Sequence, residues 1–500
     1  MPDIIKVEYV NEVHMKVTAD PSIRQELYEY FSFRPEGYQF VPSYKTRQWD
    51  GYLRLYTPFK PFLYVGLLSY IYKFAEGRGY KLDIDDKLSQ KEKIDDDYGY
   101  QLAKEINSPF VPRDYQNDYV VHALRNKRAL IISPTSSGKS YIIHLIQQHY
   151  YQAFQHRTLV VVPSIGLVHQ MAGDFKDYGV NPDMIHKIQG GVTKETNCPI
   201  VISTWQSLVN MDKEWFDQFD VIVGDEAHTF KAKSLTTIME KLTGCQYRFG
   251  FTGTVSSKSK VNKLILEGLF GGYKKIISTK DLIDDGTVAD FNVKAIVLNY
   301  YPQVKKDFRK RFKDVEPNQR YPTEIDFINN NHDRNIFLRN LLWSLENQNN
   351  LILFDRVEKH GVILKDIFEK EDRVLHFIHG GVKGEERERV RNLVENDPIK
   401  QHNILASYGT FSTGINLKKL DNVIFASGSK SEIKVLQSIG RSLRKGNGAD
   451  KATLYDIADN LSTTKKENYT LQHFRERINI YSVENFDFKI FNVDLFKKLV

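Results

Sequence analysis

The stretch ALIISPTSSGKSYIIHLIQQHYY, residues 129–151, decides the fold of this chain. It begins with an apolar run, continues through a polar turn and ends in a segment whose apolar residues have helical spacing. A strand, a loop and a helix in this order are the setting in which a loop binds phosphate. Backbone N–H groups at the start of the helix and the helix dipole both favour an anion there. The stretch therefore predicts a phosphate-binding loop in an α/β fold.

This loop has the residues that a bound nucleotide with Mg²⁺ requires. Lys139 would reach the β- and γ-phosphates of ATP, and Ser140 would ligate Mg²⁺. Ser133 stands where the general pattern has its first glycine. The predicted ATP contacts of the loop are Pro134, Thr135, Ser136, Ser137, Gly138, Lys139 and Ser140.

Outside this loop, short runs rich in β-branched residues alternate with segments of helical period. The runs are residues 129–132, 158–162, 200–202, 221–223 and 247–251, then 351–354, 374–377, 403–406, 423–426 and 453–457. Such alternation predicts two consecutive domains, each with a parallel sheet built by βαβ crossovers.

We place the first domain boundary at the charged stretch 83–97. The expected domains are residues 1–97, an N-terminal domain with its linker, and two α/β domains at 98–290 and 291–460. Residues 461–500 are too apolar for a disordered tail, so we expect a C-terminal extension packed on the second α/β domain.

The composition narrows the functional classes. The 500 residues, 41% hydrophobic and 27% charged, indicate a soluble chain of several domains. Because the net charge is only +7, a nucleic-acid partner would have to meet local basic patches. Cys198 and Cys245 stand apart, which excludes a disulfide scaffold and a cysteine-rich zinc site. We expect no secretory leader and no membrane span, because charges interrupt the first apolar stretch and no later run is long enough.

A pair of carboxylates follows the apolar run 221–223. Gly224 ends this run and is followed by Asp225, Glu226, Ala227 and His228. A carboxylate at a strand end beside a phosphate loop can give Mg²⁺ a second contact, and the next one can deprotonate the attacking water. We assign Asp225 to the metal and Glu226 to the base. For this pair alone the alternative would be a solvated acidic turn.

The segment QSIGRSLRK, residues 437–445, lies in the other α/β domain. Arg441 and Arg444 would stabilise charge on a transferring phosphoryl group, which makes hydrolysis depend on the second domain. The alternative is a structural role, in which these basic side chains lie at the end of a helix and complement the helix dipole.

Taken in order, these motifs resemble those of DEAH-box helicases of superfamily 2, over residues 108–460. The resemblance implies two tandem RecA-like parallel-sheet motor domains after a small α+β N-terminal domain, with ATP and Mg²⁺ as cofactors. It adds Arg113, Gln116 and Gln437 as ATP contacts. It also implies a group of residues that couple ATP hydrolysis to nucleic-acid binding, namely His228, Thr252, Gly253 and Thr254. The DNA contacts it implies are Pro163, Gly190, Gly191, Thr204, Thr413 and Gly414.

Residues 34–60 hold five basic and two acidic side chains, interleaved with aromatic ones. Alternating aromatics fit an ordinary sheet core, whereas aromatics with Arg and Lys also fit a fork-binding module that stacks on unpaired bases. The N-terminal region is similar to the front domain of UvsW-type recombination helicases from T-even-like phages, and this favours DNA binding through Lys45, Arg47 and Arg54.

The resemblance implies an ATP-dependent DNA helicase or translocase that remodels branched DNA in recombination, repair and replication. Its implied actions are branch migration of forks and Holliday junctions, R-loop unwinding and strand annealing. The expected partners are single-stranded DNA, branched DNA and RNA–DNA hybrids. We expect the protein to be a monomer and to act in the cytoplasm of a phage host. A motor subunit of a restriction system and an RNA helicase are the alternatives, and the former would need a separate nuclease chain. His376 and His379 have no further ligand at metal spacing, so we interpret both as structural.

Overall fold

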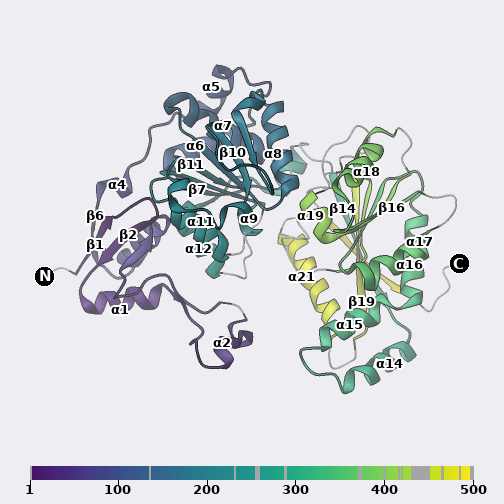
Figure 1. The fold of residues 1–500 in the computed structure, drawn as a ribbon. Helices are drawn as coiled ribbons and strands as arrows, with labels where there is room; N and C mark the ends of the chain where they lie inside the picture. Colours follow the sequence, from purple (N-terminus) through teal and green to yellow (C-terminus); the bar gives the residue numbers. More distant parts are fainter. Residues whose placement is uncertain are drawn as a thin grey trace. The chain divides into compact units, whose positions relative to one another are not determined.

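The computed structural model describes residues 3–35, 37–134, 137–229, 232–253, 260–285, 290–369, 374–397, 401–414, 417, 420–428, 451–462, 467–483 and 486–495. The chain forms two compact units, Met1–Ile277 and Ser278–Val500 (Figure 1). Each contains a seven-stranded parallel sheet. The predicted α/β fold with two tandem RecA-like domains after a small N-terminal domain is confirmed. The boundaries expected at residues 97, 290 and 460 stay predictions.

The N-terminal domain has a four-stranded mixed sheet in the order β5-β2-β1-β6. Its strands are β1(Ile4–Tyr9), β2(His14–Thr18), β5(Phe62–Tyr64) and β6(Lys81–Ile84). Alternate side chains of β1 and β2 face the core, so that Ile5, Val7, Met15 and Val17 are buried. The helices α1(Pro21–Tyr30) and α3(Leu68–Glu76) add Ile23, Leu27, Ile71, Phe74 and Ala75 to this core.

The first motor domain has a parallel sheet in the order β13-β7-β12-β11-β8-β10-β9. The strands are β7(Arg128–Ile132), β8(Thr158–Val162), β9(Ile185–Ile188), β10(Ile200–Thr204), β11(Val221–Gly224), β12(Tyr247–Thr252) and β13(Tyr273–Lys275). Its longer helices are α5(Tyr98–Glu105), α6(Asp114–Asn126), α7(Lys139–Phe154), α8(Ile165–Asp177), α11(Ala232–Lys241) and α12(Lys260–Phe270). The central strands are buried along their whole length, as expected for parallel strands that helices cover on both faces.

The N-terminal domain packs directly against this motor domain. Leu264 of α12 belongs to the N-terminal core, and the Tyr70 hydroxyl donates to Glu267 Oε2 at 2.6 Å. A side chain at Gly66 would collide with the backbone carbonyl of Glu267, so only glycine permits this close approach. The two domains therefore form one body.

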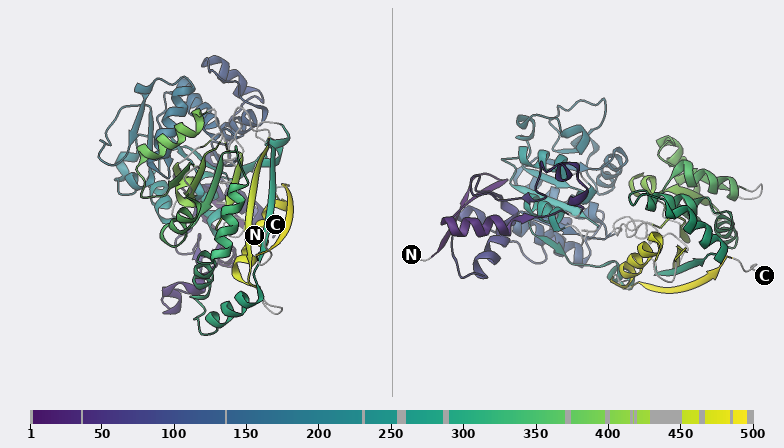
Figure 2. Two further views of the ribbon diagram at one scale, coloured as in Figure 1. Left: turned by 90° about the vertical axis from the view of Figure 1, so that its right-hand side faces the viewer. Right: turned by 90° about the horizontal axis from the view of Figure 1, so that it is seen from below.

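The second unit has a parallel sheet in the order β16-β17-β15-β18-β19-β14-β20. The strands are β14(Asp290–Asn299), β15(Asn350–Phe354), β16(Leu375–Ile378), β17(Asn403–Ser407), β18(Asn422–Phe425), β19(Lys451–Asn460) and β20(Asp487–Asp494). The main helices are α14(Pro302–Lys313), α15(Arg320–Asn329), α16(His332–Trp343), α17(Val362–Phe368), α18(Gly384–Asn396), α19(Tyr408–Gly414) and α21(Tyr469–Val483). Strand β20 pairs with β14 as an edge strand, so the C-terminal segment extends the sheet (Figure 2).

A buried ion pair joins α21 to this sheet. The Arg477 guanidinium donates to Asp456 of β19 at 2.8–3.0 Å, and both side chains are at most 1% exposed. The Tyr481 hydroxyl donates to the same carboxylate at 2.9 Å. Among the described residues, no helix could cross a membrane, and no group of three or more His, Cys, Asp or Glu side chains could hold a metal ion.

We predict that Arg477→Ala lowers the free energy of unfolding by about 3–5 kcal/mol, because it leaves Asp456 buried without its counter-charge. Urea unfolding of the full chain measures the change. Arg475→Ala on the same helix is the control, because Arg475 pairs with Glu467 at an exposed position and should contribute under about 1 kcal/mol. Equal losses in both variants would contradict the assignment.

Candidate active site

Three neighbouring strands bring the two nucleotide motifs together. Strand β12 lies between β7, which leads into the phosphate loop, and β11, which leads into the carboxylate pair. Parallel strands end at the same edge, so the three following loops meet there. The backbone N–H of Ser133 donates to the carbonyl of Thr252 at 2.9 Å, which ties the phosphate loop to the end of β12.

The phosphate loop and the segment before α6 are held together by Gln116. Its Nε2 donates to the Ser137 carbonyl at 2.9 Å, and its Oε1 accepts from the Arg113 N–H at 2.9 Å. Gly138 has a φ of +77°, and a side chain there would collide with the Gln116 amide. Both the backbone angle and the lack of space therefore require glycine.

Lys139 is the first residue of α7 and lies over the loop. Its Nζ is 3.3 Å from the Ser133 carbonyl, 3.4 Å from the Pro134 carbonyl and 3.8 Å from Glu226 Oε1. Its side chain is only 11% exposed. The structure thus places this cation between the phosphate loop and the carboxylate pair. Thr135 and Ser136 lie outside the described residues.

The carboxylate pair lies at the end of β11, where Asp225 is buried and the Glu226 side chain is 16% exposed. Burial, and then the charge of Glu226, raise the pKa of Asp225 to about 7, while the Lys139 charge opposes this rise. Asp225 Oδ1 accepts from the Glu226 N–H at 2.9 Å. Glu226 has a φ of +50°, a left-handed conformation that costs a non-glycine residue about 1–2 kcal/mol. This strained turn holds the Glu226 carboxylate toward Lys139.

His228 connects the carboxylate pair to β12. Its Nδ1 is 2.6 Å from Thr252 Oγ1 and 3.4 Å from Glu226 Oε2. Burial lowers the pKa of His228, which favours the neutral ring. Gly253 follows Thr252, whereas Thr254 lies outside the described residues.

Sequence reasoning missed Tyr178, which follows α8 directly. The Tyr178 hydroxyl lies 2.8 Å from Ser140 Oγ, the predicted metal ligand. The two residues are 38 positions apart, and no motif marks Tyr178.

The DNA contacts predicted in the first motor domain follow three adjacent strands. Pro163 follows β8, Thr204 ends β10, and Gly190 with Gly191 follows β9. Because β8, β10 and β9 are neighbours, these positions share the edge that carries the phosphate loop. The side chain of Thr204 is only 5% exposed, with Oγ1 at 3.1 Å from Ser207 Oγ.

The second unit holds two further groups of predicted site residues. Thr413 and Gly414 are the last residues of α19, which follows β17. Gln437, Arg441 and Arg444 lie outside the described residues.

The basic and aromatic segment 34–60 is an excursion from the N-terminal domain. It contains α2(Pro42–Lys45), which stands apart from the small sheet in Figure 1. Of its interleaved aromatic side chains only Tyr56 is buried, and Phe40 and Phe59 are 72% and 97% exposed. An ordinary sheet core therefore does not describe this segment.

The three predicted basic contacts in this excursion differ in their surroundings. Lys45 and Arg47 are exposed. Arg54 pairs with Asp50, and its guanidinium lies 5.3 Å from the ring centre of Tyr28. Lys45 and Arg47 are thus the more accessible cations.

We predict that Gly138→Ala weakens ATP binding at least tenfold, because a side chain at φ +77° strains the loop and displaces Gln116. Titration with a fluorescent ATP analogue measures the affinity. Gly244→Ala is the control, because Gly244 has open space around its Cα and an ordinary backbone angle. The same affinity in both variants would show that the loop tolerates the side chain.

Comparison with known proteins gives family matches along the chain. The family described as "DNA helicase UvsW, N-terminal" matches residues 3–85. "Type III restriction enzyme, res subunit" matches residues 109–257, and "Helicase conserved C-terminal domain" matches residues 333–446.

One relative is similar over its whole length. ATP-dependent DNA helicase uvsW of Enterobacteria phage T4 is 35% identical over 515 residues, which cover 98% of this chain and 100% of that protein. The crystal structure of T4 UvsW matches with a TM-score of 0.51 and 32% identity, over 98% of this chain and 99% of that one. The DNA-bound restriction-modification enzyme LlaBIII shares the fold, with a TM-score of 0.55 at 17% identity over 81% of this chain and 32% of that one.

These matches confirm the resemblance seen in the motifs. Identity to the T4 protein extends through the N-terminal domain and both motor domains. The chain belongs to the UvsW family of ATP-dependent DNA helicases.

Proposed function

We propose that this helicase remodels branched DNA in recombination, repair and replication, by migrating forks and four-way junctions, unwinding R-loops and annealing strands. The observation that carries the proposal is the N-terminal domain. It is packed rigidly on the first motor domain and extends an excursion with exposed cations and exposed aromatic rings. Cations that hold phosphates beside rings that stack on unpaired bases suit a junction between duplex and single strands.

We further propose the roles of the nucleotide site. Lys139 holds the phosphates, Ser140 and Asp225 hold Mg²⁺, and Glu226 accepts the proton of the attacking water. A hydroxyl and a carboxylate are the oxygen donors that Mg²⁺ prefers, so the residues present fit this ion. Bound Mg²⁺ supplies positive charge to the phosphate oxygens. Arg113, Gln116 and Gln437 stay predicted ATP contacts, and Arg441 and Arg444 stay predicted contacts of the phosphoryl group.

The coupling role of β12 has support in two contacts. Thr252 accepts from the phosphate loop through its carbonyl and contacts His228 through its hydroxyl. We propose that Thr252 transmits a movement of the loop at the bound phosphates to the end of β12. From this edge, the loops at Pro163, Gly190, Gly191 and Thr204 would hold a DNA strand, together with Thr413 and Gly414 of the second unit.

We predict that Glu226→Gln lowers DNA-stimulated ATP hydrolysis at least 100-fold, because the amide cannot accept the proton of water. The Glu226→Gln variant should retain ATP binding, whereas Lys139→Ala should lose both ATP binding and ATP hydrolysis. Hydrolysis is measured with single-stranded DNA, forked DNA, a four-way junction and RNA. Glu214→Gln, at an exposed position in the same unit, is the control. Stimulation by branched DNA above RNA is expected, and stimulation by RNA alone would refute the proposal.

We predict that Lys45→Glu and Arg47→Glu each weaken binding of forked DNA severalfold and lower its salt dependence by about one phosphate contact. Fluorescence anisotropy over a range of salt concentrations measures both effects. Lys81→Glu is the control, because Lys81 is also exposed but lies on β6. If all three variants bind forked DNA equally well, the excursion is not a DNA contact.

A further inference from the structure

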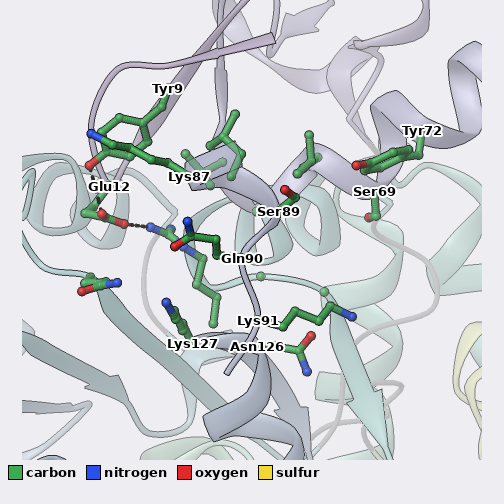
Figure 3. Close-up of a pocket in the computed structure, with 18 residues that line it drawn as sticks. Tyr9, Glu12, Ser69, Tyr72, Lys87, Ser89, Gln90, Lys91, Asn126 and Lys127 are labelled. Carbon is green, nitrogen blue, oxygen red and sulfur yellow. Dashed lines mark hydrogen bonds and ion pairs between the residues drawn. The ribbon is translucent and has the colours of Figure 1, made fainter. Parts of the chain in front are cut away.

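A cavity lies where the N-terminal domain meets the first motor domain. Its volume is about 720 Å³, within the range of about 300–1,000 Å³ typical of ligand pockets. Tyr9, Ser69 and Tyr72 of the N-terminal domain line it, together with the linker around Lys87 and Lys91 (Figure 3). Joints between domains are common places for ligand sites.

This cavity lies at the opposite end of the sheet from the nucleotide site. Arg128, which lines it, begins β7, whose other end leads into the phosphate loop. Five strand residues separate the two ends by about 15 Å. Neither Lys139 nor the carboxylate pair lines the cavity.

The charges of the lining are mainly positive. Lys87, Lys91, Lys127 and Arg128 line the cavity, and Glu12 is the carboxylate among the lining residues. Glu12 is occupied by an ion pair with Arg128, and Lys127 pairs with Glu92 at 2.8 Å. Among the described residues, no carboxylate pairs with Lys87 or Lys91, and Lys87 Nζ lies 5.4 Å from the ring centre of Tyr9. These two ammonium groups are available to an anion.

Arg128 adds an unsatisfied donor to this lining. Its Nη2 donates to Glu12, but its Nη1 is buried without a hydrogen-bond partner among the described residues. A buried donor without an acceptor is costly, and more so in a charged group. Burial lowers the pKa of Arg128, so its charge is held at an energetic cost that an added anion would reduce.

The start of a helix faces the same cavity. Val65, Gly66, Leu68 and Ser69 of the 3₁₀ turn Val65–Leu67 and of α3 line it. The N-cap residues Tyr64 and Leu67 form no capping hydrogen bond with their side chains. The positive end of the helix dipole therefore adds to the charge of the lysines.

We propose that this cavity binds the phosphate groups of a ligand, with Lys87 and Lys91 as its exposed contacts and Arg128 as a buried positive charge beside them. The phosphates could belong to a free polyphosphate or nucleotide, or to the backbone of DNA that reaches the joint. The shared chemistry is recognition of a polyanion by Lys87, Lys91, Arg128 and the start of the helix.

The test titrates inorganic pyrophosphate into the full chain by calorimetry at low salt. Every variant also carries Lys139→Ala, which weakens phosphate binding at the nucleotide loop. The double variant Lys87→Glu/Lys91→Glu is compared with Lys81→Glu/Lys93→Glu, which changes the same charge at exposed lysines of the same region outside the cavity. We expect at least tenfold weaker binding in the first pair than in the second.

Equal affinity in the two double variants, or no binding to the control, would overturn the proposal. Lys91→Gln, a milder change, should weaken binding in the same direction. A second arm adds saturating duplex DNA. Displacement of pyrophosphate, with weaker duplex binding by Lys87→Glu/Lys91→Glu, identifies DNA as the source of the phosphates. Pyrophosphate binding that persists beside DNA identifies a free ligand.

Discussion

The active edge depends on the balance between Lys139 and the two carboxylates at the end of β11. Asp225 and Glu226 follow a strand that is buried along its whole length, and burial, then the charge of Glu226, raise the pKa of Asp225 and disfavour its negative charge. The Lys139 ammonium, 3.8 Å from Glu226, is the nearby charge that opposes this effect. Its position requires the left-handed turn at Gly138, and the position of the Glu226 carboxylate requires a strained turn of its own. The geometry that we propose for catalysis and the electrostatic balance of this edge therefore depend on the same three side chains.

Strand β12 lies between β7 and β11, so the contacts that hold the phosphate loop and the carboxylate pair also involve Thr252 at the end of β12. If β7 paired directly with β11, no strand would end between the phosphate loop and the carboxylate pair. In the observed order β12 ends there, with the hydroxyl and the carbonyl of Thr252. The carbonyl binds the phosphate loop, and the hydroxyl contacts His228, which reaches Glu226. A shift of the phosphate loop would therefore act on Glu226 through three contacts, of 2.9, 2.6 and 3.4 Å. These contacts are the route by which the coupling that we propose would act.

The sequence predicts most strands of the two motor sheets. Ten of them appear where the β-branched runs stand, because burial on both faces favours such residues. The edge strands β9, β13 and β20 escaped prediction, since Ile185–Ile188 is only partly buried, Tyr273–Lys275 is exposed and Asp487–Asp494 is largely so. Strand β14 also escaped prediction, although it lies inside its sheet between β19 and β20. In the active site, the loop and the carboxylate pair follow from local spacing. Tyr178 does not, because only the packing of α8 beside α7 brings its hydroxyl to Ser140.

The joint at Gly66 determines how the N-terminal domain can act. A backbone contact too close for a Cβ, a shared apolar core and the Tyr70–Glu267 hydrogen bond join the N-terminal domain to the first motor domain in one compact unit. DNA held by Lys45 or Arg47 would therefore move with the first motor domain during each ATP cycle. If the chain acts on junctions as we propose, a front domain fixed to the motor domain would transmit each motor step to the junction, whereas a flexible linker would not. The cavity at the same joint lies where a bound polyanion would reinforce this rigidity, because its contacts come from both domains.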